Sequence, residues 1–502
     1  MKRFFAVLMV ACMLASMLCI TASAEEAPAA GVVLRVSAIK KDGVSVEVIK
    51  DFTSFEEGWN EAISRGTPKS LKNNDYTRIV VDFYADWVAN DQGEFGDDDG
   101  NGFDNTTIEI PDDIKITLNL NGHTINRNLK ESRDDGEVIY IDEDANVIIN
   151  NGTITGGKST NGAGGIHIHD ADVELNGVHI VGNVADNDDG GGIALYDGAQ
   201  LVMSRGSFTG NSIDGVSNNE LFDCYGGAIY IEDSQALFYN VEFRNNYNTT
   251  DEDYGAAIYV DNGFVYLSEC TFDGNGVADE SKNVYPAVSI VHANDSTLTM
   301  EKVSFTNNGS YCDDTNVRKQ FTKSGFYSSV IALDDSTLEI SDDSEFMNNG
   351  TCFAISCKSG AHVYVEDTIF ANNKSFVMNS GSSSADDSYF KNCTFENNKV
   401  SNAETLFTTG VSWIYTFKVQ ETLKLIDCKL SDSTYSNKKY IVFEDTDAPN
   451  GVGSIFGEGS LTMIVSILAL IASGASIFMI ADLKKKVVSA AASNAAEAND
   501  EE

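Results

Sequence analysis

The sequence is poor in basic residues. It has 34 Lys and Arg against 76 Asp and Glu, which gives a formal net charge of −42 at pH 7. The electrostatic field around such a chain repels phosphate backbones, so nucleic acid is not an expected partner. Solubility, cation binding and self-repulsion at a crowded cell surface are the general consequences of this acidity.

Cysteine does not provide a disulfide framework. The chain has nine cysteines, and two of them, Cys12 and Cys19, precede the signal-peptide cleavage site inferred below. The remaining seven are an odd number without a regular spacing. The sequence therefore does not predict a disulfide scaffold.

The N-terminus has the order of a secretory signal peptide. Two basic residues precede an apolar run over residues 4–20, and an Ala-Ser-Ala sequence ends at Ala24 before an acidic stretch. We expect cleavage after Ala24, so that residues 1–24 form the signal peptide. An uncleaved membrane anchor is disfavoured because the apolar core is short and a good cleavage site follows it.

Residues 461–481 contain no charged side chain, and three lysines follow at positions 484–486. An apolar stretch of this length crosses a hydrocarbon core of about 30 Å as a helix. Basic residues beside such a helix are retained in the cytoplasm. We therefore expect a linker over 446–460, a transmembrane helix over 461–481 and a cytoplasmic tail over 482–502. The protein would be a single-pass protein of the cell surface with its N-terminal body outside.

Residues 25–107 differ from the rest of the body and predict an N-terminal cap. Apolar residues alternate over 31–51 around an Asp-Gly turn, as in a β-hairpin. A helix is expected from Ser54 to about Arg65, with Ser54 as its N-cap and Glu57 three residues later. Residues 79–81 then read as a buried strand. A stack of repeats needs an atypical terminal unit of this kind to cover its apolar end.

The body contains a repeat, which is clearest in the stretch GGAIYIEDSQALFYNVEFRNN at residues 226–246. Its Phe-x-x-Asn sequence recurs at intervals of 24 to 41 residues, which is in the range of solenoid repeats. The Phe positions, preceded by three Ile equivalents, are Ile125, Ile154, Ile180, Phe208, Phe243, Phe272, Phe305, Phe346, Phe370 and Phe395. Asparagine lies three residues after nearly all of them, at Asn128, Asn183, Asn211, Asn246, Asn275, Asn308, Asn349, Asn373 and Asn398, and Gly157 alone breaks the row.

Apolar residues within each unit alternate with polar ones, which is the period of a strand. Two short strands precede each Phe-x-x-Asn, and a third lies upstream with pairs such as Ile229 and Ile231. Upstream pairs in other units are Ile166 and Ile168, Ile193 and Leu195, Ile258 and Val260, and Val288 and Ile290. Three strands in about thirty residues without a helix predict one coil of a parallel β-helix.

The predicted fold is therefore all-β: a parallel β-helix of about 11 coils over residues 108–445, with an N-terminal cap and a C-terminal transmembrane helix. Successive coils of such a stack lie about 4.8 Å apart, and residues at the same position of each coil form a column along the axis. The asparagines of one column can therefore hydrogen-bond to one another. Antiparallel sandwich domains are the alternative, but they give no reason for an Asn at one fixed offset. The unit ending near Leu430 lacks this Asn and reads as the last one.

Residues 108–430 resemble the right-handed parallel β-helix, or pectin lyase-like, superfamily. The pairing of Gly-Gly-Ala-Ile with Phe-x-x-Asn is similar to the repeats of chlamydial polymorphic outer-membrane proteins, and residues 226–246 match both halves. A single C-terminal helix stands where those proteins have an outer-membrane barrel. The resemblance implies a right-handed coil, and the helix indicates a cell surface with one membrane.

Enzymes of this superfamily place their acids on the outer face of one sheet. The first outward column beside the upstream pairs reads Tyr140, His167, Ala194, Tyr230, Tyr259 and Ser289, and the next reads Asp142, His169, Tyr196, Glu232 and Asp261. Aromatic rings beside carboxylates can bind a sugar chain by stacking and by hydroxyl contacts. The alternative is a solvated sheet face whose tyrosines reflect β-propensity. The candidate ligand-binding residues are His167, Tyr230, Glu232, Tyr259 and Asp261.

No catalytic set is recognisable. Glycoside hydrolysis requires two carboxylates that flank the bond. Asp186, Asp188 and Asp189 cluster near a corner, and His167 and His169 lie one coil earlier, but aspartates at a glycine-rich turn are typical turn formers. The Gly-His-Gly and Arg-x-Lys pattern of polygalacturonases is absent, as are the basic residues that pectate lyases use. The sequence leaves enzyme activity open and favours a protein without it.

A calcium loop is the one candidate metal site. Asp97, Asp99 and Asn101 are followed by Gly102, as in the first half of an EF-hand loop. The expected Glu at the twelfth position is replaced by Ile108, and Asp104 is a substitute ligand. The alternative is an acidic surface loop. No other cofactor is predicted.

Three cysteines, Cys270, Cys393 and Cys428, lie two residues before an apolar row position, where other units have valine. We interpret them as small apolar core residues.

These features predict an exported, membrane-anchored β-helix protein that acts as an adhesin or binds glycans. The expected partners are the membrane, through residues 461–481, and a polysaccharide or a ligand on a host or neighbouring cell. A membrane-tethered polysaccharide lyase or glycoside hydrolase is one alternative, and a structural spacer in the cell envelope is another.

Overall fold

The computed structural model describes residues 28–89, 107–214, 224–248, 254–277, 289–309, 328–351, 353–358, 360–374, 376–380, 388–398, 407–409, 423–430 and 441–444. The chain divides into two units, Met1–Glu444 and Asp445–Glu502, and every described residue belongs to the first. The predicted signal peptide, calcium loop (Asp97, Asp99, Asn101 and Asp104), linker, transmembrane helix and tail lie outside the described residues. No helix among the described residues is long and apolar enough to cross a membrane.

The N-terminal region contains the predicted hairpin, β1 (Leu34–Lys40) and β2 (Val46–Phe52), which pair antiparallel. The predicted helix is α2 (Phe55–Gly66), and the Ser54 hydroxyl accepts the Glu57 N–H as its N-cap. A second helix, α3 (Pro68–Asn73), was not predicted. It leads into β3 (Tyr76–Phe83), the expected buried strand, and then β4 (Trp87–Val88).

The N-terminal region joins the stack through its strands. β3 pairs parallel with β6 (Lys115–Asn119), the second strand of the array, and β4 pairs with β7 (Thr124–Asn126), the third. The buried side chains of this region, such as Trp59 on α2, belong to the same apolar core as the coils. A helix and a hairpin therefore cover the coil end that would otherwise be exposed.

The upstream strand of each unit forms an 11-stranded sheet, called sheet B, in which all neighbours are parallel. One strand per coil gives eleven coils in the part of the chain that the structure describes, which agrees with the predicted number. Its strands are β5 (Ile108–Ile110), β8 (Ile139–Ile141), β11 (Ile166–His169), β14 (Ile193–Tyr196), β18 (Ile229–Glu232), β22 (Ile258–Asp261), β25 (Ser289–Asn294), β28 (Ser329–Asp334), β31 (Phe353–Cys357), β34 (Phe376–Ser380) and β37 (Phe407–Thr409).

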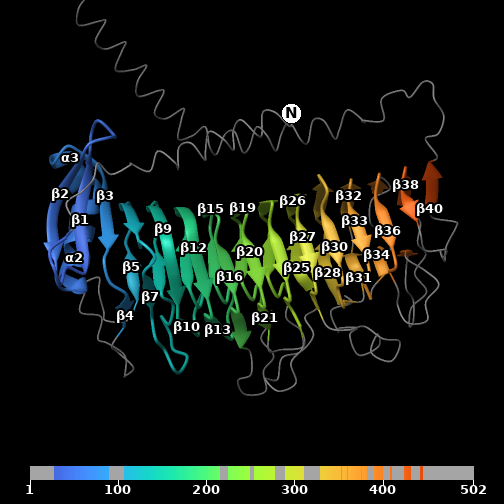
Figure 1. The fold of residues 1–502 in the computed structure, drawn as a ribbon, viewed down its shortest axis with the longest axis horizontal. Helices are drawn as coiled ribbons and strands as arrows, with labels where there is room; N and C mark the ends of the chain where they lie inside the picture. Colours follow the sequence, from blue (N-terminus) through green and yellow to red (C-terminus); the bar gives the residue numbers. More distant parts are fainter. Residues whose placement is uncertain are drawn as a thin grey trace, which may run out of the picture. The chain divides into compact units, whose positions relative to one another are not determined.

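The other two strands of each unit lie in sheet A, a 25-stranded sheet that also contains β1 to β4. Figure 1 shows these strands side by side in successive coils. The first row is β6 (Lys115–Asn119), β9 (Asn146–Thr155), β12 (Asp172–Val181), β15 (Gln200–Ser204), β19 (Gln235–Tyr239), β23 (Phe264–Ser268), β26 (Thr297–Glu301), β29 (Thr337–Ser341), β32 (His362–Glu366), β35 (Tyr389–Lys391), β38 (Leu423–Ile426) and β40 (Ile441–Glu444). The second row comprises β7 (Thr124–Asn126), the ends of β9 and β12, β16 (Ser207–Thr209), β20 (Glu242–Arg244), β24 (Thr271–Asp273), β27 (Ser304–Thr306), β30 (Glu345–Met347), β33 (Ile369–Ala371), β36 (Thr394–Glu396) and β39 (Lys429–Leu430).

A third, four-stranded sheet was not predicted. It follows the Phe-x-x-Asn segment in four successive coils and consists of β10 (Lys158–Ser159), β13 (Val184–Asp186), β17 (Ser212–Asp214) and β21 (Tyr247–Asn248). Its strands have only two or three residues, which is too short for alternation to be recognised in the sequence.

The phenylalanine row forms a stack in the core. All seven rings, from Phe208 to Phe395, are fully buried, and neighbouring rings lie 4.5 to 5.3 Å apart with nearly parallel planes. Offset stacking adds about 0.5–1.5 kcal/mol per pair to the free energy gained by burial. The row therefore holds successive coils in register.

The asparagine row forms a hydrogen-bonded ladder from Asn183 to Asn398. Each Nδ2 donates to the Oδ1 of the next asparagine along the axis, as between Asn246 and Asn275 at 2.9 Å. Each Nδ2 also donates to a carbonyl of the preceding coil, as from Asn246 to Phe208 at 3.0 Å. The predicted interaction along the axis is confirmed, and the break at Gly157 is confirmed as well, since its N–H donates to Asn183.

Two predictions about the ends of the array are wrong. Asn128 does not belong to the ladder; it is exposed with φ of 56°, and Leu129 is buried beside it, because the first coil has one extra residue at this corner. The unit ending near Leu430 is the eleventh coil by sheet B, but it does not end the stack, because β40 pairs with β38 as a further strand of sheet A.

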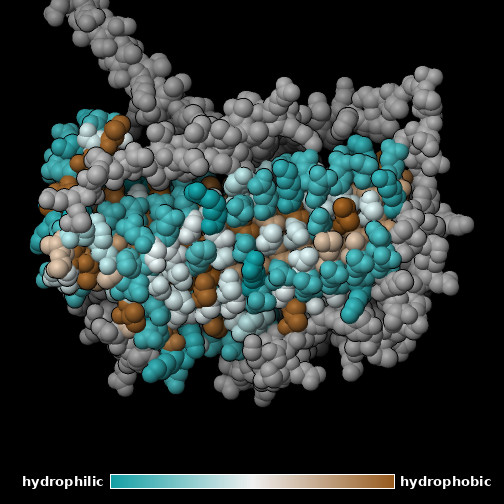
Figure 2. Space-filling model, viewed as in Figure 1, coloured by the Kyte–Doolittle hydropathy of each residue, from teal (hydrophilic) through white to brown (hydrophobic). Residues whose placement is uncertain are grey.

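The face shown in Figure 2 is mainly hydrophilic, with apolar side chains in small separate patches. Among the described residues, the exposed apolar side chains Val202 and Ile369 are single positions on strands of sheet A, whereas Val46 and Val48 lie together on β2. Single exposed apolar residues of this kind do not mark an interface.

Candidate functional site

The outer face of sheet B carries the two predicted columns. Parallel pairing places His167 opposite Tyr140 and Ala194, and Tyr230 opposite Ala194 and Tyr259. In the second column, His169 lies opposite Tyr196, and Glu232 opposite Asp261. Because alternate side chains of each strand point inward, both columns face away from the core.

The first column departs from the prediction at β25. Tyr259 pairs with His292, not Ser289, and the inward residues are Val291 and Ala293 instead of Val288 and Ile290. Alternation alone fits either register. The next strand could have decided it, since Ile258 precedes Val265 by seven residues and Val291 precedes Leu298 by the same number.

The rings of the two columns form a continuous series, which we call the aromatic column. Its members are Tyr140, His167, Tyr196, Tyr230, Tyr259 and His292, with centroids of successive rings 4.9 to 5.6 Å apart. Tyr196 belongs to the second column but bridges His167 and Tyr230, where the first column has Ala194. The aromatic column therefore crosses six successive strands of sheet B, from β8 to β25.

Two tyrosines that the sequence did not single out cover part of this column. Tyr225 stacks on Tyr259 with centroids 4.3 Å apart, and Tyr254 lies 4.6 Å from the His292 ring. Tyr225 and Tyr254 form an isolated parallel bridge just before β18 and β22. The signal that could have found them is a Tyr directly before the glycine in both units, at Tyr225-Gly226 and Tyr254-Gly255.

Burial divides the aromatic column into two parts. Tyr230 and Tyr259 are only 6% and 7% exposed, and His292 is 4% exposed. Tyr140, His167 and Tyr196 are half-buried. A ligand therefore reaches the edges of the rings from β8 to β14 most easily, and the rings of β18 to β25 support them from one side.

Carboxylates border the aromatic column. His169 Nε2 lies 2.9 Å from Asp197 Oδ2, and its Nδ1 lies 3.8 Å from Asp142 Oδ1. Further along, the Asn294 amide donates to Asp261 at 2.8 Å, and burial raises the pKa of Glu232. The acidic side chains are half-buried or exposed, so they offer hydrogen-bond acceptors beside the rings.

Burial keeps the aromatic column uncharged. It lowers the pKa of His167 to about 4, and the nearby His169 acts in the same direction. It lowers the pKa of His292 to about 3 and raises the pKa of Tyr140 to about 12. At neutral pH the rings are therefore neutral, and the charge of this face comes from the carboxylates at its border.

The family model of the right-handed β-helix region matches residues 114–281 and 215–432, which together cover more than half of the chain. The chain belongs to the right-handed β-helix family. The coil expected from the pectin lyase-like resemblance is confirmed, including its hand. The similarity to chlamydial repeats stays a prediction. No curated protein matches the sequence.

In this right-handed β-helix, the aspartates near His167 hold turns together. Asp188 accepts the Gly162 N–H at 2.9 Å, and Asp189 accepts the Tyr225 N–H at 2.6 Å. Asp189 thereby positions Tyr225 over the aromatic column. These contacts agree with the interpretation of the aspartates as turn formers.

A second polar set lies on the outer face of sheet A of the β-helix and was not predicted. Tyr266 donates to Glu301 at 2.8 Å, and Tyr389 donates to Glu366 at 2.9 Å. Burial raises the pKa of Glu339 on the strand between them, and the charges of Glu301 and Glu366 add to this shift. Glu301 and Glu366 each accept a hydrogen bond from a tyrosine of a neighbouring strand. We therefore interpret these groups as cross-strand pairs.

No group of three or more His, Cys, Asp and Glu side chains among the described residues of the β-helix is arranged to hold a metal ion. The calcium proposal for Asp97, Asp99, Asn101 and Asp104 concerns residues outside that part. It stays a prediction, as does the assignment of the five ligand-binding residues.

Proposed function

We propose that this right-handed β-helix is displayed at a cell surface and binds glycans along the outer face of sheet B. The aromatic column carries the proposal. The spacing between neighbouring strands places successive rings about 5 Å apart. This separation is close to the length of one sugar unit in an extended chain. The exposed ring edges at this spacing offer apolar contacts to successive sugar units, and the bordering carboxylates accept hydrogen bonds from the hydroxyls.

The half-buried rings of Tyr140, His167 and Tyr196 form the first part of the proposed site. Glu232 and Asp261 extend it along the axis beside Tyr230 and Tyr259. These last two tyrosines are too covered to stack on a sugar face, so their role in the proposal is to support the neighbouring rings. The site would hold a chain that runs along the stack.

The negative charge of the proposed site favours glycans that carry no negative charge themselves. Asp142, Asp197, Glu232 and Asp261 repel uronic acids and sulfated sugars, whereas neutral sugars and amino sugars meet acceptors. His167 does not compensate, because its low pKa keeps it neutral above pH 5. We therefore propose neutral or amino-sugar polysaccharides as the ligand class.

Display at the surface rests on the sequence of the two ends. The signal peptide over 1–24 and the apolar segment over 461–481 make up an export and anchoring plan, with the β-helix outside and the tail over 482–502 inside. A ligand would then be a polysaccharide of the cell's own envelope or of a neighbouring or host cell.

A panel of polysaccharides tests this proposal. Purified protein is incubated with insoluble neutral, amino-sugar and acidic polysaccharides, and both retention and released sugars are measured. The proposal predicts retention on neutral or amino-sugar chains without release. Release of oligosaccharides would indicate a lyase or hydrolase, and absence of both would leave the role of an envelope spacer.

A matched variant locates the binding. Tyr239 is half-buried on the outer face of sheet A, so Tyr239→Ala is the control for Tyr196→Ala on sheet B. The proposal predicts that Tyr196→Ala loses most of the retention and that Tyr239→Ala keeps it. Equal retention by both variants would place the binding elsewhere.

A further inference from the structure

Two cysteines occupy the same position in neighbouring coils near the end of the described array. Thr394 on β36 pairs with Lys429 on β39, so Cys393 and Cys428, one residue before each, are in register. Successive coils are about 4.8 Å apart, which lies within the range of Cα separations that a disulfide spans. Both are free thiols in this structure.

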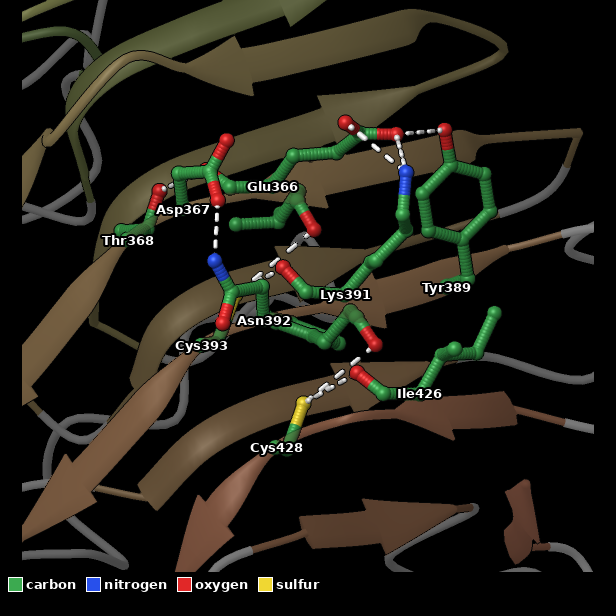
Figure 3. A network of polar contacts seen from close by, with 11 residues as sticks. Glu366, Asp367, Thr368, Tyr389, Lys391, Asn392, Cys393, Ile426 and Cys428 are labelled. Atoms are coloured by element: carbon green, nitrogen blue, oxygen red, sulfur yellow. Dashed lines mark hydrogen bonds and ion pairs between the residues drawn. The ribbon is translucent and has the colours of Figure 1, made fainter. Parts of the chain in front are cut away.

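The two thiols have equivalent surroundings. Cys428 Sγ donates to the carbonyls of Phe390 and Ile426, both at 3.4 Å, and Cys393 Sγ donates to the carbonyls of Val365 and Lys391 at 3.6 and 3.3 Å. Figure 3 shows the two residues at equivalent corners, just before β36 and β39, with the Cys428 sulfur hydrogen-bonded to the Ile426 carbonyl. Because Cys393 and Cys428 have the same position and the same contacts, both side chains point in the same direction, toward the core side of the corner.

The thiols also interact with each other. The neighbouring Cys393 thiol lowers the pKa of Cys428, and the Cys428 thiol together with burial raises the pKa of Cys393. Cys393 is fully buried and Cys428 is partly exposed. Cys428 is therefore the thiol that a reagent reaches first and that ionises first.

The two residue types that recur in the core change at this place in the sequence. The phenylalanine row ends at Phe395, since Leu430 occupies the next position, and the sequence has Ser433 where the asparagine ladder would continue after Asn398. A covalent bond between these two coils would add a link at the point where the residue types of both rows change.

We propose that Cys393 and Cys428 form a disulfide that joins the coil of β36 to the coil of β39. The oxidant is a disulfide of the thiol-exchange class, such as oxidised glutathione or an oxidised dithiol protein. The proposal is independent of glycan binding, and it agrees with export to an oxidising compartment.

The reaction proceeds by thiol–disulfide exchange. The Cys428 thiolate attacks one sulfur of the oxidant, forms a mixed disulfide and releases the first thiolate. Cys393 loses its proton and attacks the Cys428 sulfur, which releases the second thiolate. The two cysteines lose two protons and two electrons in total, and the oxidant is reduced to two thiols.

The experiment treats the folded full-length protein with oxidised glutathione, blocks the remaining thiols after unfolding in acid, and maps non-reduced peptides by mass spectrometry. The expected result is a Cys393–Cys428 cross-linked peptide, about 2 Da lighter than the sum of its two reduced peptides, which disappears with dithiothreitol. Recovery of the two cysteines as separate blocked or glutathione-capped peptides would overturn the proposal.

Cys270 provides the matched control. It occupies the same column position and is fully buried, but its neighbours in this column are Val241 and Val303. Oxidised wild-type protein should melt a few degrees above the reduced form, and Cys270→Val should keep this difference. Cys428→Val should abolish it. A redox-dependent shift that survives Cys428→Val would contradict the proposal as well.

Discussion

Each asparagine of the ladder satisfies buried backbone groups as well as its own amide. Asn275 Oδ1 accepts the Asn246 N–H at 3.0 Å and the Asn246 Nδ2 at 2.9 Å, and Asn275 Nδ2 donates to the Phe243 carbonyl at 2.8 Å. Asparagine carries an acceptor oxygen and a separate donor amide on one short side chain, so a single residue makes both contacts at this corner. This explains why the same residue recurs at one offset.

We predict that Asn275→Ala destabilises the protein by about 3 kcal/mol, because it leaves the Asn246 N–H and the Phe243 carbonyl buried without partners. The urea midpoint should fall accordingly. The control is Asn245→Gly, at a neighbouring corner residue with φ of 52° where adjacent coils already have Gly210 and Gly274. It should change stability by less than about 1 kcal/mol. Similar losses in both variants would show that the ladder is not the source of the stability.

A buried carboxyl in an early coil makes stability depend on pH. Glu137 accepts the Ser159 hydroxyl at 3.4 Å, and burial raises its pKa to about 7, with Asp135 acting in the same direction and Arg127 opposing it. The unfolded state loses this proton near pH 4.5, whereas the folded state keeps it until about pH 7. The group therefore costs no stability below pH 4.5, and its cost grows as the pH rises to 7.

Glu137→Gln should remove this cost while keeping an acceptor for Ser159. We predict that the variant is more stable than the wild type at pH 8, by up to about 3 kcal/mol, and that the two are equal at pH 4. Urea unfolding at both pH values measures the difference. A difference that is the same at pH 4 and pH 8 would show that Glu137 does not titrate in this way.

At the scale of the elements, every coil is a register-preserving copy of its neighbour. Ile229 pairs with Ile258 on sheet B, and Phe243 pairs with Phe272 on sheet A. A strand has a side-chain period of two, so a shift by one residue turns the inward residues outward. The protein should therefore tolerate the deletion of one whole coil but not a deletion that shifts the register of the following strands.

We predict that deletion of residues 229–257 leaves a folded protein, because Ile258 then follows Ala228 and takes the place of Ile229. Deletion of residues 229–258 is the control and should give an unfolded or aggregated product. Circular dichroism and urea unfolding compare the two. Equal folding of both deletions would contradict strict register.

Strands with several alternating apolar and polar residues at a fixed spacing could be predicted from the sequence. The features that were missed or misplaced have physical causes. The phenylalanine and asparagine rows could be read from the sequence because both lie after short turns of constant length. Register at β25 was misread because the connection before it varies in length, and Asn128 was misplaced because one extra residue was not visible. The short strands of the third sheet and the covering role of Tyr225 depend on tertiary contacts.

At the scale of the whole molecule, the inward columns of side chains build the fold, and the outward columns of sheet B form the candidate binding site. The inward columns repeat because stacking requires it, so their recurrence carries no information about a ligand. The outward columns of sheet B vary from coil to coil, and this variation is the source of the candidate site. The sequence identified its members on β8 to β22 but not their burial, because burial depends on what packs against the face.

Export and anchoring belong to the same scale. We predict that the mature protein from its native cells begins at Glu25, since cleavage follows Ala24. It should remain in the membrane fraction after an alkaline wash, and protease added to intact cells should remove the body. N-terminal sequencing and fractionation check both points. Recovery in the soluble fraction with Met1 retained would contradict this plan.

The most direct measurement is calorimetric titration of the purified protein with a soluble oligosaccharide of the polysaccharide that retains it best. The account predicts saturable binding that is weakened about tenfold or more by Tyr196→Ala, which removes a stacking ring from the middle of the aromatic column. Tyr239→Ala should bind like the wild type. Absence of binding heat, or equal affinity of Tyr196→Ala and the wild type, would contradict glycan binding on sheet B.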